Sequence, residues 1–280
     1  MRIIRFKCTF ILLAFISCLA GCSGGFKEKL IKDEIIKDMG IKGALTEQKL
    51  LSINKFCLEE YSECESLEDI SKLKNIDRLT LGYRSDKFKP EIISVSSVES
   101  ADIIASKNKM YENDLKIIMD SCNKIECFEI IPSDNSIHFE SLEFLAGTAD
   151  SLEYLHLYYM DVDDYSYIYE CANLQELVIY YNQNFDDEDL VGIDQLEHCE
   201  AILLQGTNVS KADQFLEMKN LKTLCIENTP LAENEEELDR IREKFPDIVI
   251  RRNNDDYQIT KLIYDPKDLV VLEYVPKQDK

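Results

Sequence analysis

Few side chains in this 280-residue chain could take part in catalysis. Cys127 and His156 form the clearest pairing, because a thiol close to an imidazole is the minimum for a cysteine nucleophile. No third group that would orient His156 can be assigned, and the chain has only three histidines. Glycine-rich phosphate loops, the G-x-S-x-G elbow and the H-E-x-x-H motif are absent. We therefore expect neither an enzymatic activity nor a cofactor.

Two runs of carboxylates could bind a cation. Residues 161–164 (DVDD) and 186–189 (DDED) could offer oxygen ligands to calcium. Neither run fits the twelve-residue calcium loop, because Tyr165 occupies a ligand position and no glycine follows. Solvated turns are the simpler interpretation. We expect no metal site, and calcium binding at these turns is the alternative.

The first 21 residues are predicted to be a signal peptide. Arg2, Arg5 and Lys7 give a basic start, and the apolar run after them is too short to span a bilayer as a helix. Residues 19–22 (LAGC) resemble a bacterial lipobox, in which the signal peptidase cuts before the cysteine. The resemblance implies that Cys22 carries acyl chains such as palmitate. They would anchor the protein on the extracytoplasmic side of the cell membrane or the outer membrane. An ordinary secretory peptide is the alternative.

Acidic residues outnumber basic ones by 54 to 32. The net charge is −22, and it becomes −25 when Arg2, Arg5 and Lys7 are removed with the signal peptide. This excess argues against nucleic acid or an anionic lipid surface as the main partner. Besides Cys22, an odd number of cysteines remains in the mature chain, without a C-x-x-C pair. We expect these thiols to be mostly free, and no zinc site among them.

The body of the chain repeats the unit apolar-x-x-apolar-x-apolar. The central residues of eight units are Phe56, Leu79, Phe128, Leu155, Leu177, Ile202, Leu224 and Ile248. Successive centres lie 22 to 27 residues apart, except for one step of 49 residues that spans residues 82–127. The alternation within each unit predicts a short strand with one core-facing side. A single unit could not bury that side, whereas stacked units could.

These units resemble the leucine-rich-repeat family of the internalin type, whose repeats have about 20–29 residues. Residues 67–76 (LEDISKLKNI) resemble the convex half of such a repeat, and the match covers residues 49–252. The resemblance implies an α/β fold, a leucine-rich-repeat solenoid with a parallel concave β-sheet. The asparagine that usually ends the strand turn is present only at Asn182 and Asn253. In other repeats its place is taken by Arg84, Ser133, Met160, Thr207 or Thr229, so we expect an irregular solenoid.

Both ends of the solenoid need caps. Residues 26–48 are predicted to form an N-terminal helical cap, with apolar residues at helical spacing up to Met39 and Gly40 closing the helix. Residues 253–280 are predicted to be a C-terminal β cap or tail, with strands over 259–264 and 269–274 around a turn at 265–268. Residues 22–25 would be the tether. Inside the double step, residues 101–104 are predicted to be a hidden strand and residues 110–119 a helix.

The outward positions of the strands define the candidate binding surface. On the concave face we expect Tyr154, His156, Tyr158, Glu176, Val178, Tyr180, Leu203 and Gln205. Cys127, Glu129 and Ile131 would flank these residues on one side. Tyrosine suits interfaces and sugar rings, because it offers a large apolar area with a polar tip. The alternative is that the rings only pack on one another.

The internalin resemblance implies surface recognition without chemistry. We expect a membrane-anchored protein, monomeric itself, that binds another protein through its concave face. The partner would be on a host or neighbouring cell. Two alternatives remain open: glycan or cell-wall binding by the tyrosines, and a scaffold role in the envelope.

Overall fold

The structure, a computed structural model, describes residues 25–82, 101–132, 137–252, 257–264 and 270–276. The predicted signal peptide with Cys22 lies outside the described residues. So do Arg84, Ser133, Asn253 and the predicted turn at residues 265–268. What the sequence predicts for these positions stays a prediction.

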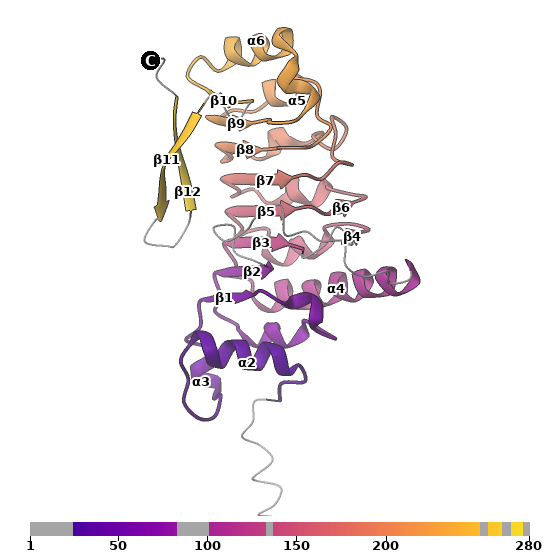
Figure 1. Ribbon diagram of the computed structural model, residues 1–280, viewed down its shortest axis with the longest axis vertical. Coiled ribbons are helices and arrows are strands. Elements are labelled where there is room, and N and C mark those ends of the chain that lie inside the picture. Colours follow the sequence, from indigo (N-terminus) through magenta and orange to yellow (C-terminus); the bar gives the residue numbers. More distant parts are fainter. Residues whose placement is uncertain (1–24, 83–100, 133–136, 253–256, 265–269, 277–280) are drawn as a thin grey trace, which may run out of the picture.

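One parallel sheet forms the body of the protein (Figure 1). Its strands, in spatial order, are β1 (Lys55–Leu58), β2 (Arg78–Gly82), β3 (Cys127–Ile131), β5 (Tyr154–Tyr158), β7 (Glu176–Tyr180), β8 (Ala201–Leu203), β9 (Thr223–Cys225) and β10 (Val249–Arg251). Each inner strand is hydrogen-bonded to the strands of the repeats before and after it, whereas β1 and β10 lie at the edges and have one neighbour each. The sheet stays open, which confirms a leucine-rich-repeat solenoid.

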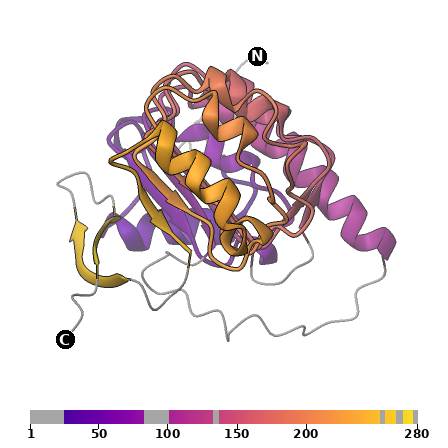
Figure 2. The same cartoon turned by 90° about the horizontal axis from the view of Figure 1, so that it is seen from above.

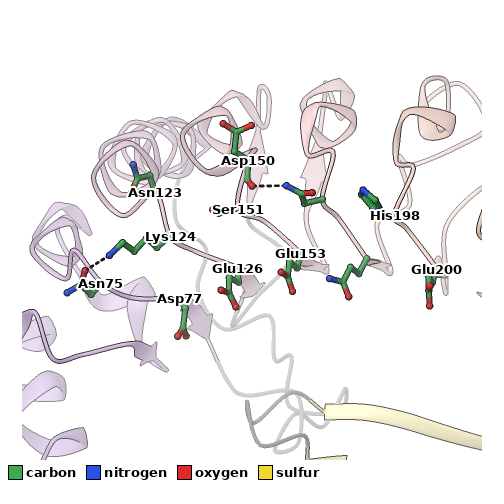
Figure 3. Close-up of a pocket in the computed structure, with 12 residues that line it drawn as sticks. Asn75, Asp77, Asn123, Lys124, Glu126, Asp150, Ser151, Glu153, His198 and Glu200 are labelled. Carbon is green, nitrogen blue, oxygen red and sulfur yellow. Dashed lines mark hydrogen bonds between the residues drawn. The ribbon is translucent and has the colours of Figure 1, made fainter.

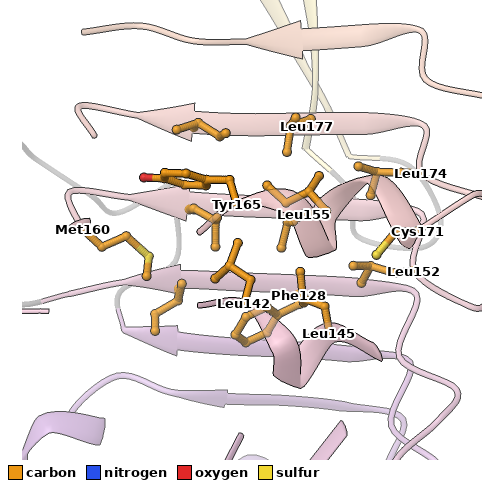
Figure 4. Packing of buried hydrophobic residues seen from close by; sticks show 14 of the residues in the cluster. Phe128, Leu142, Leu145, Leu152, Leu155, Met160, Tyr165, Cys171, Leu174 and Leu177 are labelled. Atoms are coloured by element: carbon orange, nitrogen blue, oxygen red, sulfur yellow. The ribbon is translucent and has the colours of Figure 1, made fainter. Parts of the chain in front are cut away.

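The apolar residues of the repeated unit form ladders inside the solenoid (Figure 4). The register places Leu79 opposite both Phe56 and Phe128, and Leu155 opposite both Phe128 and Leu177. All of these side chains are 3% exposed or less. Those on inner strands are covered by the equivalent residues of the repeats on both sides, and Phe56 on the edge strand β1 is covered by Leu79, so no repeat could bury its own core alone.

Short helical segments cover the side of the core opposite the sheet. Seen from above, the repeats superpose with these segments gathered on one side (Figure 2). They are the 3₁₀ turns η1 (Tyr61–Glu63), η2 (Glu68–Lys72), η4 (Glu143–Thr148), η5 (Ser166–Glu170), η6 (Ile193–Gln195) and η7 (Pro230–Glu233), and the helices α5 (Asp213–Leu216) and α6 (Glu235–Lys244). A 3₁₀ turn is short and tight, which suits a repeat that has few residues with which to return the chain to the next strand. The two-stranded parallel pair β4 (His138–Phe139) and β6 (Asp161–Val162) lies between sheet and turns.

The prediction of a hidden strand at residues 101–104 is wrong. These residues begin the helix α4 (Ala101–Ser121), and β2 pairs directly with β3. The double step is therefore one repeat with an enlarged convex half, and the predicted helix at 110–119 is part of α4. Leu115 and Ile118 of α4 are fully buried. No helix in the described ranges is both long and apolar enough to cross a bilayer, α4 included.

The phase predicted for the eighth unit is also wrong. Ile250, and not Ile248, pairs with Leu224. Side chains alternate along a strand with a period of two, so a shift of two residues leaves the same side chains facing the core. The apolar pattern alone could therefore not distinguish the two registers. In addition, β10 lies at the edge of the sheet and has a neighbouring strand on one side only, so fewer contacts determine its register.

The ends of the solenoid differ in structure. At the N-terminus, α2 (Lys29–Asp38) buries Ile31 and Ile35, and α3 (Glu47–Leu50) follows it. After β10, the strands β11 (Tyr257–Tyr264) and β12 (Val270–Pro276) pair antiparallel in a separate two-stranded sheet that lies beside the solenoid (Figure 1). The predicted strand pair is present with slightly different bounds, and its role as a cap stays a prediction.

Two threonines replace the asparagine of the strand turn. Asn182 is fully buried, and its Oδ1 accepts a hydrogen bond of 2.9 Å from the backbone N–H of Met160. At the equivalent position, Thr207 Oγ1 donates to the carbonyl of Leu204, and Thr229 Oγ1 donates to that of Ile226. The threonine hydroxyl thus closes the turn within its own repeat. The amide ladder is interrupted while the turn is kept.

Carboxylates connect neighbouring repeats on the convex side. Asp114 of α4, which is 7% exposed, accepts hydrogen bonds from the backbone N–H of Leu67 (2.7 Å) and from Ser66 Oγ (2.9 Å). Asp187 accepts from the backbone N–H groups of the following repeat at residues 210 and 211. Glu237 accepts from the N–H of Ala212. Part of the acidic excess therefore serves the stacking of the repeats, because charged acceptors make strong hydrogen bonds.

Replacing Asp114 by alanine should destabilise the protein by about 1–3 kcal/mol. The buried N–H of Leu67 would lose its acceptor, and such a group carries a full desolvation cost. Asp114→Asn, which keeps an acceptor oxygen, should cost clearly less. Chemical denaturation of the two variants and the wild type measures both values. Equal losses in the two variants would contradict a hydrogen-bonding role for Asp114.

Candidate binding surface

The eight residues predicted on the concave face form one patch. The register aligns six of them in pairs across β5 and β7: Tyr154 with Glu176, His156 with Val178, and Tyr158 with Tyr180. Leu203 on β8 continues the row of Val178. Gln205 follows β8, and its Oε1 accepts a hydrogen bond from the hydroxyl of Tyr180. We call these eight residues the concave patch; their role in binding stays a prediction.

The concave patch is closely packed. Val178 and Gln205 are only 4% and 6% exposed, and the other members are half-buried. The rings of Tyr158 and Tyr180 lie 5.6 Å apart between centroids, and His156 meets Tyr158 edge-on. The alternation along the strands predicts correctly which face of the sheet each side chain lies on. It does not predict how far the neighbouring side chains bury it. A partner would reach mainly tyrosine edges and polar tips.

His156 lies between two carboxylates on the concave face. Its Nε2 is 2.8 Å from Glu176 Oε1, and its Nδ1 is 3.7 Å from Glu129 Oε1. Glu129 also accepts a hydrogen bond from Thr80 Oγ1. Desolvation is the largest single influence and lowers the pKa of His156. Hydrogen bonds and charge attraction from the two glutamates together outweigh it and raise this pKa to about 9. The raised pKa favours the protonated, cationic form of this half-buried histidine at neutral pH.

The alternative of a cysteine nucleophile loses its physical basis. Burial raises the pKa of the Cys127 thiol to about 12, so the reactive thiolate is scarce at neutral pH. In the register Cys127 is opposite Tyr154, while His156 is opposite Glu129. A protonated His156 could not accept a proton from the thiol. All seven cysteines in the described ranges are free and buried, as expected of thiols in the core.

The acidic turns are held by hydrogen bonds within the protein. Asp164 accepts from the backbone N–H of Ser166, and Asp186 accepts from that of Glu188. Asp163 is 3.2 Å from His138 Nε2. Among the residues described by the structure, no group of three or more potential ligands could hold a metal ion. Turn formation explains these carboxylates without calcium.

A groove along the edge where the strands begin was not predicted. It has a volume of about 730 Å³, and Asp77, Glu126, Glu153 and Glu200 lie along it, with Gln175 at the same position of the repeat between the last two (Figure 3). Each is the last residue before its strand. The carbonyl of each accepts hydrogen bonds from two N–H groups of the next repeat, as Glu126 does from Glu153 and Tyr154. In the sequence, each of these acidic residues directly follows the first apolar residue of its unit, and this recurrence could have predicted the acidic row.

Asparagines form a second ladder beside this groove. The side-chain amides of Asn75, Asn173 and Asn220 each donate a 2.8 Å hydrogen bond to a backbone carbonyl of the preceding repeat. Each asparagine directly precedes the first apolar residue of a unit, a recurrence that could have been found in the sequence. These contacts fix the spacing of the repeats and so hold the acidic row in line.

Tyr159 and Tyr181 were also missed by sequence reasoning. They follow the last residues of β5 and β7 and have positive φ angles of 51° and 54°. The available signal was the doublet Tyr-Tyr, present at 158–159 and again at 180–181. Strand alternation assigns the first tyrosine of each doublet to the concave face and says nothing of the second. The two rings are stacked, with centroids 5.1 Å apart and planes at 5°.

No family model matches the chain, and none of the curated proteins does. The solved structures that show a weak likeness include three with 14% identity each. Internalin C2 of Listeria monocytogenes has a TM-score of 0.49 over 81% of this chain and 94% of its own. An internalin F of the same organism has 0.41 over 81% and 75%. A leucine-rich-repeat protein of Leptospira interrogans has 0.22 over 72% and 73%. The fold assignment rests on the register of the sheet and not on these values.

The His156 cluster should make stability depend on pH between about 6.5 and 9. The pKa is raised in the folded state, so the stabilisation is complete below the unfolded pKa of 6.5 and is lost as pH rises through about 9. The wild type should lose roughly 3 kcal/mol more than His156→Gln over this range. Denaturant unfolding at each pH measures it, with the exposed His198→Gln as the control. Parallel pH profiles of wild type and His156→Gln would contradict the raised pKa of His156.

Proposed function

We propose that this leucine-rich-repeat solenoid is a lipid-anchored protein that binds another protein through its concave face and catalyses no reaction. The observation that carries the proposal is the concave patch. There the parallel register brings Tyr154, Tyr158 and Tyr180 next to a charged histidine on one rigid sheet. Solenoids of stacked repeats offer extended concave surfaces of this kind for binding. Tyrosines held on strands lose little entropy when they contact a partner.

The charge of the surface restricts the partner. The chain carries a net charge of −22, and the acidic row of Asp77, Glu126, Glu153 and Glu200 lies at the edge of the same sheet. An approaching acidic surface would be repelled. A partner with basic side chains would be attracted and oriented before contact, and a partner with uncharged ones would not be repelled. A protein exposed on a host or neighbouring cell, with such a surface, is the occupant that we propose.

The anchor is proposed from the sequence. Cys22 would carry the acyl chains, and α2 begins seven residues later at Lys29. Seven extended residues reach about 25 Å at most. The N-terminal cap would therefore stand close to the lipid surface, on the extracytoplasmic side of the cell membrane or the outer membrane. The concave patch lies in the middle repeats, away from that end.

Replacing the three concave tyrosines by alanine should abolish capture of the partner. Residues 26–280 would first be used to capture proteins from cell-surface and secreted fractions. The affinity of the identified partner for the wild type would then be compared with its affinity for the triple variant Tyr154→Ala, Tyr158→Ala, Tyr180→Ala. We expect a loss of at least about tenfold, because aromatic side chains carry much of the energy of interfaces.

The matched control is Tyr167→Ala, which removes a half-buried tyrosine from η5 on the convex side. It should bind the partner as the wild type does. Thermal unfolding of all variants would establish that the fold is kept. Capture that is unchanged in the triple variant would refute binding through the concave patch.

Replacing Cys22 by alanine should release the protein from membranes. Without the thiol, no acyl chain can be attached, and the hydrophobic burial of its methylene groups is lost. Partition between detergent and aqueous phases measures the change, with Ser23→Ala as the control that keeps the attachment site. Mass spectrometry of the N-terminal peptide would identify the lipid. A Cys22→Ala protein that still enters the detergent phase would rule the anchor out.

A further inference from the structure

Two tyrosines occupy a backbone position that does not favour them. Tyr159 and Tyr181 adopt φ angles of 51° and 54°, and the same place in the next two repeats holds Gly206 (72°) and Asn228 (56°). Glycine and asparagine are the residues that adopt the left-handed region readily, whereas a bulky side chain there is strained. The turn itself therefore needs no tyrosine. Strain that a fold retains at one place points to a role for the side chain.

The rings of both tyrosines are held in a fixed arrangement. They stack in parallel with centroids 5.1 Å apart. The hydroxyl of Tyr181 accepts hydrogen bonds from Gln205 Nε2 (3.2 Å) and Asn228 Nδ2 (3.3 Å). A Cβ on Gly206 would come within 2.5 Å of the Tyr181 ring, so glycine leaves the room that the ring occupies. The stack is a prearranged aromatic surface, and little entropy would be lost when a ligand contacts it.

A cavity lies directly beside this stack. It has a volume of about 300 Å³ and is lined by Tyr159, Met160, Asp161, Tyr181, Gln183 and Asn184. The side chains of Asp161, Gln183 and Asn184 make no hydrogen bond with any part of the chain that the structure describes. Aromatic rings and unused polar groups thus face one space, outside the concave patch and at the edge where the strands end.

We propose that this cavity is a binding site for one neutral hexopyranose ring of an oligosaccharide. The apolar C–H face of a pyranose would pack against the tyrosine rings, which form the apolar wall that a small-ligand site needs. Its hydroxyl groups would donate to the carboxylate of Asp161. They would both donate to and accept from the amides of Gln183 and Asn184.

The charge of the site selects a neutral sugar. Asp161 is the ionisable carboxylate among the lining residues, and the whole chain is strongly acidic. A uronate or sialic acid would be repelled there. A proline-rich peptide also packs on aromatic rings, but it presents few groups to hydrogen-bond with. It would leave the polar side chains of Asp161, Gln183 and Asn184 desolvated without partners, which is unfavourable.

The site can be tested by saturation-transfer NMR on residues 26–280 with selective irradiation of aromatic protons. The probes are maltotriose, cellotriose and chitotriose, with trigalacturonate as the acidic comparison. We expect transfer to the C–H protons of at least one neutral trisaccharide and none to trigalacturonate. Tyr159→Gly and Tyr181→Gly should each weaken binding at least about tenfold. Glycine is chosen because it keeps the positive φ, so the turn is retained.

Three further variants make the result specific. Asp161→Ala should weaken binding of the same sugar, while Tyr167→Ala on the convex side should not change it. Tyr154→Ala changes the concave patch at the opposite end of β5 from Tyr159 and should keep sugar binding, so that failure of the protein-binding proposal and failure of this one are distinguishable. Absence of transfer from all three neutral sugars overturns the proposal. Saturation transfer in the Tyr159→Gly protein that equals transfer in the wild type would also overturn it. The same holds for binding of a proline-rich peptide without binding of the sugars.

Discussion

The whole structure depends on one constraint: a repeat can bury its apolar residues only between two others. Leu79 and Leu155 are fully buried because the equivalent residues of neighbouring repeats cover them on both sides. The parallel register follows, since only an in-register stack keeps every apolar position in line. The regular spacing of the outward side chains is a consequence of the same stack, and with it the concave patch.

Polar contacts fix how closely the repeats stack. Asparagine amides such as Asn173 reach a carbonyl of the preceding repeat, and carboxylates such as Asp114 and Asp187 accept backbone N–H groups of neighbouring repeats. These links explain why an acidic chain can form a close stack: part of its charge is used in hydrogen bonds. The enlarged repeat that contains α4 is accommodated by the same means, because Asp114 connects α4 to the repeat before it.

The two proposed binding surfaces lie at different parts of the strands, one on the concave face and one at the edge where the strands end. On the concave face, His156 is charged because two glutamates from neighbouring strands compensate its burial. At the edge where the strands end, the turn places Tyr159 and Tyr181 in a stack. Both arrangements combine side chains from two or three repeats. A solenoid can thus carry separate sites on one sheet, and each can change without disturbing the core.

The sequence by itself determined the repeat, the direction of the strand side chains and the eight residues of the concave patch. Periodicity suffices for this, because alternation and repeat length are local properties. Only the tertiary structure decided that residues 101–104 belong to a helix and that Ile250 pairs with Leu224. A shift of two residues preserves the pattern of faces, so contacts with the next strand are needed to choose. Burial of Val178 and the charge of His156 likewise depend on neighbours that are distant in sequence.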